Sequence, residues 1–341
     1  MAAEEISEIE PGQEWAVELF RPEDAEGAAH LFRTVYGEGY PIRHFVEPDR
    51  LREENAAGRI LCSIVRTPRG DVIGHVALFR SAPWDGIAEL GSGLVHPAYR
   101  GGKVIFERMM RHALDAGTSR FGLHASFGEP VCNHVISQKL VVPMGFHTGA
   151  LEVDLMPAEA YTTEKSAEGR VAAFLCFQTA RPRPHAVYLP ECYGKTLRSL
   201  YGDFDDAREL LPTSGPLPKG VATRIEGQIF DFSRVARLAV HELGSDFAEV
   251  LRREEEEARA RGCVVVQVWV KLSRPWVGEA VNELRNRQYF LGGILPRWFD
   301  DDGLLMQKVW GVPSWEGIRF HFKRDGWLLD KVRKDWEDTL F

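Results

Sequence analysis

The feature that most constrains the fold is a strand pattern that leads through a glycine-rich turn directly into a helix pattern. Residues 89–96 are typical of a strand, and residues 97–103 form the turn. The apolar positions that follow recur at helical spacing: Phe106, Met109, Met110, Ala113 and Leu114. A strand that feeds a helix in this way predicts an α/β domain with the turn at the end of a central strand.

The remaining patterns continue this alternation. The first half predicts the order β-α-β-β-β-α-β-α-β. Its strands lie at 15–20, 60–66, 72–79, 89–96, 121–127 and 150–155, and its helices begin at residue 22 and after residue 103 and span 133–142. The second half predicts helices at 191–204, 247–262 and 279–288 and strands at 222–230, 235–241, 263–272 and 304–309. A chain of 341 residues is long enough for two domains. We therefore expect two mixed α/β modules from a diverged duplication, at residues 14–160 and 161–341.

Charge and composition exclude several function classes. Hydrophobic residues make up 44% and charged residues 27%, as in ordinary globular proteins. The net charge of −8 lies entirely in the first 160 residues, and residues 1–13 are predicted to be an acidic, solvated tail. This balance disfavours nucleic-acid binding through bulk charge.

Neither export nor membrane insertion is expected. The longest uncharged run, residues 140–151, holds twelve residues and includes a proline, whereas a membrane helix needs about twenty apolar residues. The acidic N-terminus does not fit a signal peptide. The five cysteines have no C-x-x-C spacing, which argues against a disulfide framework and against a metal site; they are Cys62, Cys132, Cys176, Cys192 and Cys263. A cytoplasmic protein with reduced thiols is the prediction.

The turn itself predicts a phosphate site. The N-terminus of a helix presents unsatisfied backbone N–H groups and the positive end of the helix dipole. Gly101 and Gly102 let the backbone approach a ligand closely, and Arg100 adds a fixed cation. Such a turn is suited to hold a diphosphate, although most glycine pairs before helices are merely turns.

Two segments carry a family resemblance. Val95-His96-Pro97-Ala98-Tyr99-Arg100-Gly101-Gly102 resembles motif A of the GNAT superfamily of N-acetyltransferases, V-x-P-x-Y-R-G-x-G-x-G/A. The segment that runs from His134 through Ser137 to Gly145-Phe146 is similar to the family's N-x-x-A-x-x-L-Y-x-x-x-G-F helix. The resemblance covers residues 15–156. The second half is matched only through its element order and an expected turn at residues 290–296.

The resemblance implies a fold, a co-substrate and a reaction. Two tandem GNAT-like modules would each hold a mixed sheet between helices, and the first would bind acetyl-CoA or another acyl-CoA. The residues it implies for cofactor binding are Leu94, Val95, Arg100, Gly101, Gly102, Lys103, Val104 and Ser137. Backbone groups near Leu94 and Val95 would bind pantetheine and polarise the thioester carbonyl. The implied partner is a small amine that attacks acyl-CoA directly, with no metal, and a homo-oligomer is compatible with it.

The chain also departs from the family pattern. Lys103, Val104 and Ile105 follow Gly102, so the later small residues of the motif are replaced by larger ones. Val141 stands where many members carry a tyrosine acid. In the second half, Leu243-Gly244-Ser245-Asp246 starts the helix without an R-G-x-G, so this module is expected not to bind CoA.

Three residues are candidates for proton transfer, each with a structural alternative. Glu89 begins the central strand and would place a carboxylate at the acceptor cleft, unless it is a surface residue. His124, expected midway along a strand, has a suitable intrinsic pKa, but a histidine satisfied in the core is the plainer interpretation. His134 heads the helix that carries Ser137 and serves either as a proton carrier or as a cap. Tyr36 and Tyr40 either wall the acceptor site or pack their loop.

The leading hypothesis is therefore a cytoplasmic acyl-CoA-dependent N-acetyltransferase. P-loop, nucleophile-elbow, zinc-protease and dinucleotide-binding motifs are not found in the sequence. Two alternatives stay open at this point: a non-catalytic acyl-CoA-binding or regulatory protein, and an interaction module in which both cofactor sites are lost.

Overall fold

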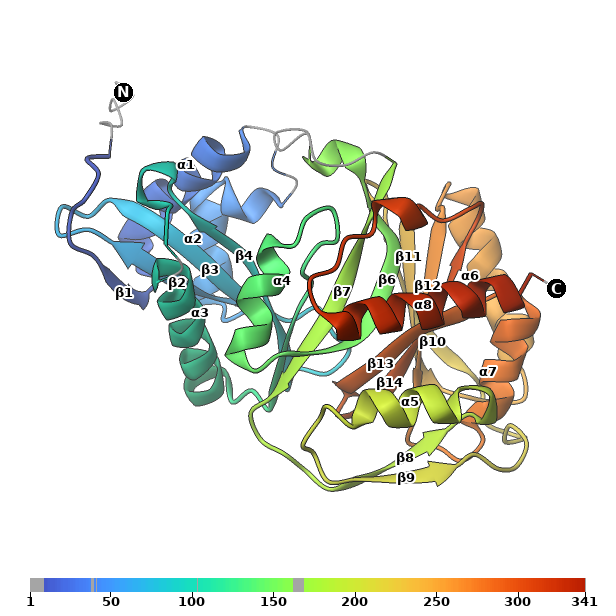
Figure 1. Ribbon diagram of the computed structural model, residues 1–341. Helices are drawn as coiled ribbons and strands as arrows, with labels where there is room; N and C mark the ends of the chain where they lie inside the picture. The colour runs from blue at the N-terminus through green and yellow to red at the C-terminus, as the bar shows by residue number, and fades with distance from the viewer. Residues whose placement is uncertain (1–8, 38–39, 41, 103, 162–168, 341) are drawn as a thin grey trace. The chain divides into compact units, whose positions relative to one another are not determined.

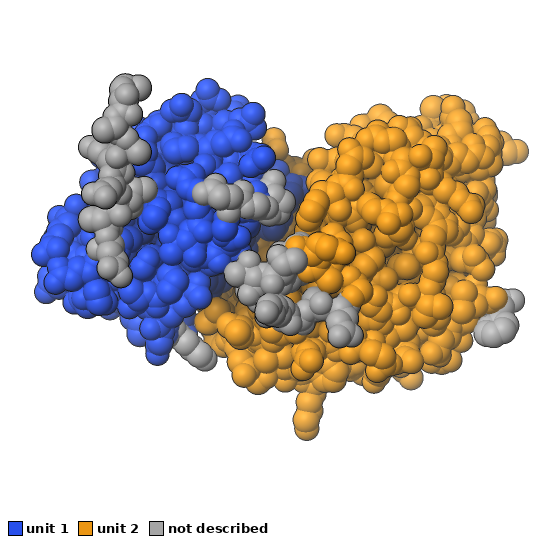
Figure 2. Space-filling view, turned by 90° about the horizontal axis from the view of Figure 1, so that it is seen from above, with its two compact units in different colours: residues 1–81, 88–123 blue, residues 82–87, 124–341 orange. Residues whose placement is uncertain are grey.

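The computed structural model describes residues 9–37, 40, 42–102, 104–161 and 169–340. The chain forms two compact units (Figure 2). Unit 1 comprises residues 1–81 and 88–123, and unit 2 comprises residues 82–87 and 124–341. These units divide the chain at other positions than the predicted domains 14–160 and 161–341. Most of the expected acidic tail, residues 1–8, lies outside the described residues.

Unit 1 is a four-stranded antiparallel sheet with helices. Its elements are β1 (Ala16–Leu19), α1 (Ala25–Tyr36), α2 (Pro48–Ala56), β2 (Ile60–Arg66), β3 (Val72–Phe79), β4 (Ile87–Val95, of which Ile87 belongs to unit 2) and α3 (Val104–Ala116). The strand order is β1-β2-β3-β4. The apolar stripe of α1 packs on the sheet together with α2, in a core that includes Phe32, Phe45 and Leu94. Helix α3 contacts β1, β2 and β3 (Figure 1).

Unit 2 holds the other strands and helices. They are β5 (Ala125–Gly128), α4 (Ile136–Val141), β6 (His147–Pro157), β7 (Arg170–Thr179), β8 (His185–Leu189), α5 (Gly194–Tyr201), β9 (Arg208–Pro212), β10 (Arg224–Phe230), β11 (Val235–Glu242), α6 (Phe247–Ala260), β12 (Val265–Lys271), α7 (Val277–Asn286), β13 (Phe290–Phe299), β14 (Asp301–Val309) and α8 (Lys323–Asp338). Its large sheet has the order β5-β7-β6-β13-β14-β12-β11-β10, and β8 pairs with β9 separately. Helices α8 and α5 contact β13 and β6 (Figure 1).

The sheet of unit 2 repeats itself about the junction of β6 and β13. On one side the order outward from the junction is β6-β7-β5, and on the other it is β13-β14-β12. Both β6 and β13 have a register shift at a glycine, Gly149 and Gly292. Five residues further along each strand, Asp154 and Arg297 both have positive φ, 54° and 57°. Ala150 pairs with Gly293 at the junction, so equivalent positions of the two halves face each other.

The mixed α/β class is confirmed, and several predicted elements are wrong. Residues 290–296, expected as a turn, belong to the buried strand β13. The segment 121–127 is not one strand, because a π-helical turn occupies Gly117–Phe121 and Gly122 adopts a left-handed conformation (φ 66°) before β5 begins. The expected helix 133–142 is shorter, spanning only Ile136–Val141.

Within the described residues, the structure contains no helix that is both long and apolar enough to cross a membrane.

Candidate functional site

The turn between β4 and α3 is ordered by its own side chains. Arg100 Nε donates to the carbonyl oxygen of Val95 at 2.9 Å, which ties the guanidinium to the strand end. His96 Nδ1 accepts the N–H of Ala98 at 3.3 Å, and the N–H of Tyr99 donates to the carbonyl of His96 at 2.9 Å. Arg100 is thereby held at the end of β4, where the strand leads into the glycine turn.

The glycines of this turn leave space for a ligand. Gly101 has φ +127°, a conformation that side chains rarely adopt. Both Gly101 and Gly102 are exposed, and an added Cβ would meet nothing within 4 Å at either position. Among the described residues, no group accepts a hydrogen bond from their backbone N–H groups. Val104 opens α3 with 56% of its surface exposed, and Lys103 lies outside the described residues. This arrangement is suited to an anionic group.

A bulge interrupts β4 before the turn. Ala77 pairs with Gly91 and His75 with Leu94, so β4 contains one more residue than β3 over this stretch. Ser92 adopts φ +52° there, a conformation that costs a residue with a side chain about 1 kcal/mol. The bulge interrupts the regular hydrogen bonding between β3 and β4. Backbone N–H and C=O groups of β4 that a regular strand pair would use are therefore left for other partners.

A buried histidine supports the bulge. His75 is fully buried, and its Nδ1 lies 3.0 Å from the carbonyl oxygen of Ser92. Because a carbonyl only accepts, Nδ1 carries the proton. Burial lowers the pKa of His75 to about 4, so the ring is neutral at ordinary pH. The His75 ring makes T-shaped contacts with the rings of Phe32 and Phe45, whose centroids lie 5.0 and 5.1 Å from its own.

Sequence reasoning missed His75. It lies in an apolar strand between Gly74 and Val76, and nothing in that pattern signals an extra residue in the neighbouring strand.

Glu89 lies on the same strand, beside the bulge. Its Oε2 accepts from Ser81 Oγ at 2.9 Å, and its Oε1 lies 3.2 Å from the position that a Cβ on Gly91 would take. The carboxylate thus leans along β4 over Gly91 toward Ser92. Glu89 pairs with Phe79, which packs against the core beneath α1 and α2. Glu89 was expected to begin the strand but lies two residues after its start at Ile87, and its catalytic role stays a prediction.

Aromatic side chains from the end of α1 and from the loop after it lie on the same face of the sheet. Tyr36 and Tyr40 stack with ring centroids 4.9 Å apart, and Tyr40 packs 5.0 Å from Phe32. Tyr40 Oη lies 3.5 Å from Ser92 Oγ at the bulge. Unit 1 therefore brings Glu89, Ser92 and Tyr40 to one face of β4, near the end that carries the glycine turn.

The candidates on α4 belong to unit 2. His134 Nδ1 accepts the N–H of Ile136 at 3.3 Å, an arrangement typical of the capping alternative. Ser137 Oγ is buried without a hydrogen-bond partner among the described residues. Val141 is only 8% exposed and offers no proton. The roles of His134 and Ser137 stay predictions.

His124 does not lie within a strand but immediately before β5, because the π-helical turn displaces the strand start. Its N–H donates to the carbonyl of Gly86 at 2.8 Å, and its ring packs edge-on against Trp84 at 5.3 Å. Partial burial, aided by the charges of Arg297 and Arg181, lowers its pKa. These contacts are typical of a packing residue.

The corresponding turn of the second half, between β11 and α6, is filled by its own chain. The N–H of Gly244 donates to Thr223 Oγ1 at 2.9 Å, and the N–H of Ser245 donates to the carbonyl of Pro218 at 3.1 Å. A Cβ on Gly244 would lie 1.9 Å from the carbonyl oxygen of Val221. Strands β11 and β12 also pair in parallel from Val235–Val265 to Val240–Val270. This turn has no amide left for a phosphate at Gly244 or Ser245.

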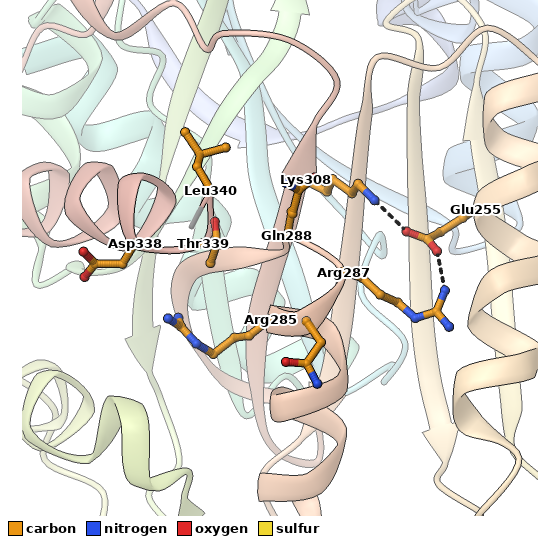
Figure 3. A pocket seen from close by; sticks show the side chains of 9 residues that line it. Glu255, Arg285, Arg287, Gln288, Lys308, Asp338, Thr339 and Leu340 are labelled. Atoms are coloured by element: carbon orange, nitrogen blue, oxygen red, sulfur yellow. Dashed lines mark hydrogen bonds and ion pairs between the residues drawn. The ribbon is translucent and has the colours of Figure 1, made fainter.

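A hollow of about 570 Å³ in unit 2 also contains charged side chains (Figure 3). Glu255 accepts from Lys308 Nζ and from Arg287 Nη1, both at 3.1 Å, and Arg285 pairs with Asp335. Since each of these cations already contacts a carboxylate, the hollow is a poor match for a phosphate. The described residues contain no group of three or more His, Cys, Asp or Glu side chains placed to hold a metal ion.

No protein-family model and no curated protein matches the chain. Solved structures of GNAT N-acetyltransferases are similar to about half of it. Ribosomal-protein-S5-alanine acetyltransferase from Vibrio fischeri is 16% identical, with a TM-score of 0.40, and the match covers 51% of this chain and 95% of that one. Spermidine/spermine N-acetyltransferase SpeG from Vibrio cholerae is 17% identical, with a TM-score of 0.37, over 49% of this chain and 95% of that one. A dodecameric spermidine N-acetyltransferase from Vibrio cholerae is 16% identical, with a TM-score of 0.38, over 48% and 93%.

Proposed function

We propose that this protein is an acyl-CoA-dependent N-acyltransferase that transfers an acetyl group to a small amine. The observation that carries the proposal is the pair of exposed glycines before α3, whose backbone N–H groups have no acceptor among the described residues, with Arg100 held at the end of β4 just before them in the chain. These N–H groups and the guanidinium suit the diphosphate of acetyl-CoA, because both kinds of group donate hydrogen bonds to negatively charged phosphate oxygens. Lys103, Val104 and Ser137 stay predictions for cofactor binding.

The bulged end of β4 supports the chemical step. Backbone groups near Leu94 and Val95 would hold pantetheine and polarise the thioester carbonyl, which is an ordinary way to stabilise the developing oxyanion. Glu89 is the proposed base, because its carboxylate lies on the same face as the bulge and takes the proton that the attacking amine releases. The second module, whose turn is closed by residues 218–223, would not bind CoA. A small-molecule amine is the proposed partner, and homo-oligomerisation stays a prediction.

A non-catalytic acyl-CoA-binding protein is the second candidate. It is favoured by Val141, a buried apolar side chain at the position where the family resemblance implies an acid. This candidate predicts cofactor binding without turnover.

Two measurements test the proposal and separate it from its rival. Calorimetric titration compares acetyl-CoA with pantetheine, which lacks the diphosphate, and we expect acetyl-CoA to bind at least about tenfold more tightly. Thiol release is then followed with acetyl-CoA and a panel of primary amines that includes propylamine, cadaverine and spermidine. Binding with amine-dependent release supports the acyltransferase, whereas binding without release for every amine supports the non-catalytic protein. Equal affinity for the two ligands contradicts a diphosphate site at the turn.

A further inference from the structure

Acyl transfer from CoA is accelerated by an acid as well as by a base. When the C–S bond breaks, sulfur departs with the electron pair as a thiolate, whose conjugate thiol has an ordinary pKa near 8.5, and a nearby proton donor stabilises it. Val141 cannot supply that proton. A protic side chain near the bulge of β4 is a candidate for this acid, beside His134 and solvent.

Two hydroxyl groups of unit 1 meet at this bulge. Tyr40 Oη lies 3.5 Å from Ser92 Oγ, and Ser92 is the residue with φ +52°. A phenol, with an ordinary pKa near 10, is far closer to the thiol in acidity than an aliphatic hydroxyl is. The phenol is therefore the better proton donor of the two.

Packing fixes the Tyr40 ring in place. It stacks on Tyr36 at 4.9 Å, and it lies 5.0 Å from Phe32, a fully buried residue on the core-facing side of α1. Phe32 also contacts the ring of His75 at 5.0 Å. The ring that carries the phenol and the ring that holds the bulge are thus packed against the same phenylalanine.

His75 holds Ser92, the residue at the bulge whose hydroxyl lies near Tyr40. Its Nδ1–H donates to the backbone carbonyl of Ser92 at 3.0 Å, from a fully buried position on β3. Without this donor, that carbonyl would lose its partner at a residue already in an unfavourable conformation. His75 does not touch substrate and acts only through Ser92, so its role is one of position.

We propose that Tyr40 is the acid that protonates the departing thiolate and that His75 is the positioning residue that holds the β4 bulge beside it. This inference rests on the proposed acyltransferase function. The amine nitrogen forms the C–N bond with its lone pair, and the carbonyl π electrons move to oxygen. As the carbonyl re-forms, the C–S bond breaks and its electron pair stays on sulfur. Glu89 takes the proton from nitrogen and Tyr40 gives its phenolic proton to sulfur. Solvent carries the proton from Glu89 back to the phenolate, so acetyl-CoA and amine yield amide and CoA thiol.

Tyr40→Phe tests the acid. With the amine that gives the fastest thiol release, we expect kcat to fall about 100-fold, while KM for acetyl-CoA changes less than about threefold. The wild-type kcat should decline at alkaline pH as the phenol ionises, and this decline should be absent in Tyr40→Phe. Tyr36→Phe removes the same atom from the stacked ring and should retain the alkaline decline.

His75→Leu and His75→Asn test the positioning role. Leucine still fills the buried position but has no N–H donor. We expect kcat to fall about tenfold with little change in KM for acetyl-CoA. Asparagine offers an N–H donor at a similar distance and should restore most of the loss. His112→Leu is the matched control, because His112 Nδ1 bonds Ser63 Oγ at 2.8 Å in the same unit. It should lower thermal stability and leave kcat unchanged.

The outcomes separate this inference from the function it rests on. If wild-type protein binds acetyl-CoA but releases no thiol with any amine, the acyltransferase proposal fails and the inference fails with it. If wild type turns over and Tyr40→Phe keeps more than half of kcat, the acid is wrongly assigned while the function stands. If His75→Asn is as slow as His75→Leu although both fold by circular dichroism, the histidine has only a packing role.

Discussion

Two strand-to-helix turns of this protein, β4 to α3 in unit 1 and β11 to α6 in unit 2, both contain glycine but differ in the partners of their backbone N–H groups. Each places glycine-containing backbone at the N-terminus of a helix of 13 or 14 residues. In the first turn, Gly101 and Gly102 are exposed, and their N–H groups have no acceptor among the described residues. In the second, Thr223 and the carbonyl of Pro218 occupy the amides of Gly244 and Ser245. The difference teaches that a helix N-terminus becomes a ligand site only when the chain leaves its donors unused.

Glycine has a different purpose in each turn. At Gly244 the absence of a Cβ lets the carbonyl of Val221 approach, so the glycine serves packing. At Gly102 a Cβ would meet nothing within 4 Å, so no packing contact among the described residues requires a glycine there. Motif searches treat these glycines alike, whereas their neighbours separate them.

The largest expected effect is on the pH dependence of stability, to which a buried histidine of each unit should contribute with opposite sign. His75 in unit 1 has a pKa lowered to about 4, so the unfolded chain binds more protons than the folded one between about pH 6.5 and 4. Its contribution to stability is complete above pH 6.5 and is lost as the pH falls toward 4, by about 3 kcal/mol. Urea unfolding of wild type and His75→Asn at pH 7 and pH 4.5 measures this, and wild type should lose more stability on acidification.

His185 in unit 2 should show the opposite sign. Burial acts to lower its pKa, but the hydrogen bond to Asp302 at 3.1 Å and the charge of that carboxylate raise it on balance. Its stabilising contribution is therefore complete below pH 6.5 and is lost as the pH rises through the raised value. The stability difference between wild type and His185→Asn should be larger at pH 5.5 than at pH 8.5. A difference independent of pH for both histidines would contradict this contrast.

An intermediate effect is expected from alanine at the glycines of the two turns. Gly244→Ala places a Cβ 1.9 Å from the carbonyl of Val221, and we expect a loss of about 2 kcal/mol in the free energy of unfolding. Gly102→Ala is the matched control, since a Cβ there meets nothing within 4 Å, and its unfolding free energy should change by less than about 0.5 kcal/mol. Equal losses in denaturant titrations would show that the turns do not differ as described.

The smallest expected effect concerns Arg100. Arg100→Ala removes a cation held beside the first turn, and we expect affinity for CoA to fall about tenfold, or about 1.4 kcal/mol. Pantetheine, without the diphosphate, should bind wild type and variant equally by calorimetry. Arg253→Ala, on α6 after the second turn, should leave CoA affinity unchanged. If Arg100→Ala binds CoA as wild type does, the phosphates lie elsewhere.

Sequence patterns located the first turn and Glu89 because both depend on local chemistry. The glycine pair, the arginine and the helical spacing after them are contiguous, so their arrangement follows from short-range geometry. The bulge at Ser92 depends instead on a mismatch between β3 and β4 and on a donor, His75, from the neighbouring strand. A single sequence contains no direct record of that pairing.

Two wrong predictions have the same physical origin. Gly292 and Gly293 were expected to break the chain into a turn, yet they allow β13 to cross close to β6, where a Cβ on Gly293 would lie 2.2 Å from the carbonyl of Gly149. Phe121 to Phe127 has the apolar character of a strand, but Gly122 provides a left-handed stop that delays β5 and leaves His124 outside it. Tertiary contact decides the meaning of glycine in both places.

The pairing of Ala150 with Gly293 has a consequence for how this chain can be divided. At that point β6 and β13 each cover an edge that would otherwise expose a row of unpaired backbone groups to solvent. Truncation after either repeat would uncover one of these edges and invite association with any extended chain nearby. Each of the two structural repeats of unit 2 therefore protects the edge strand of the other from pairing with another chain.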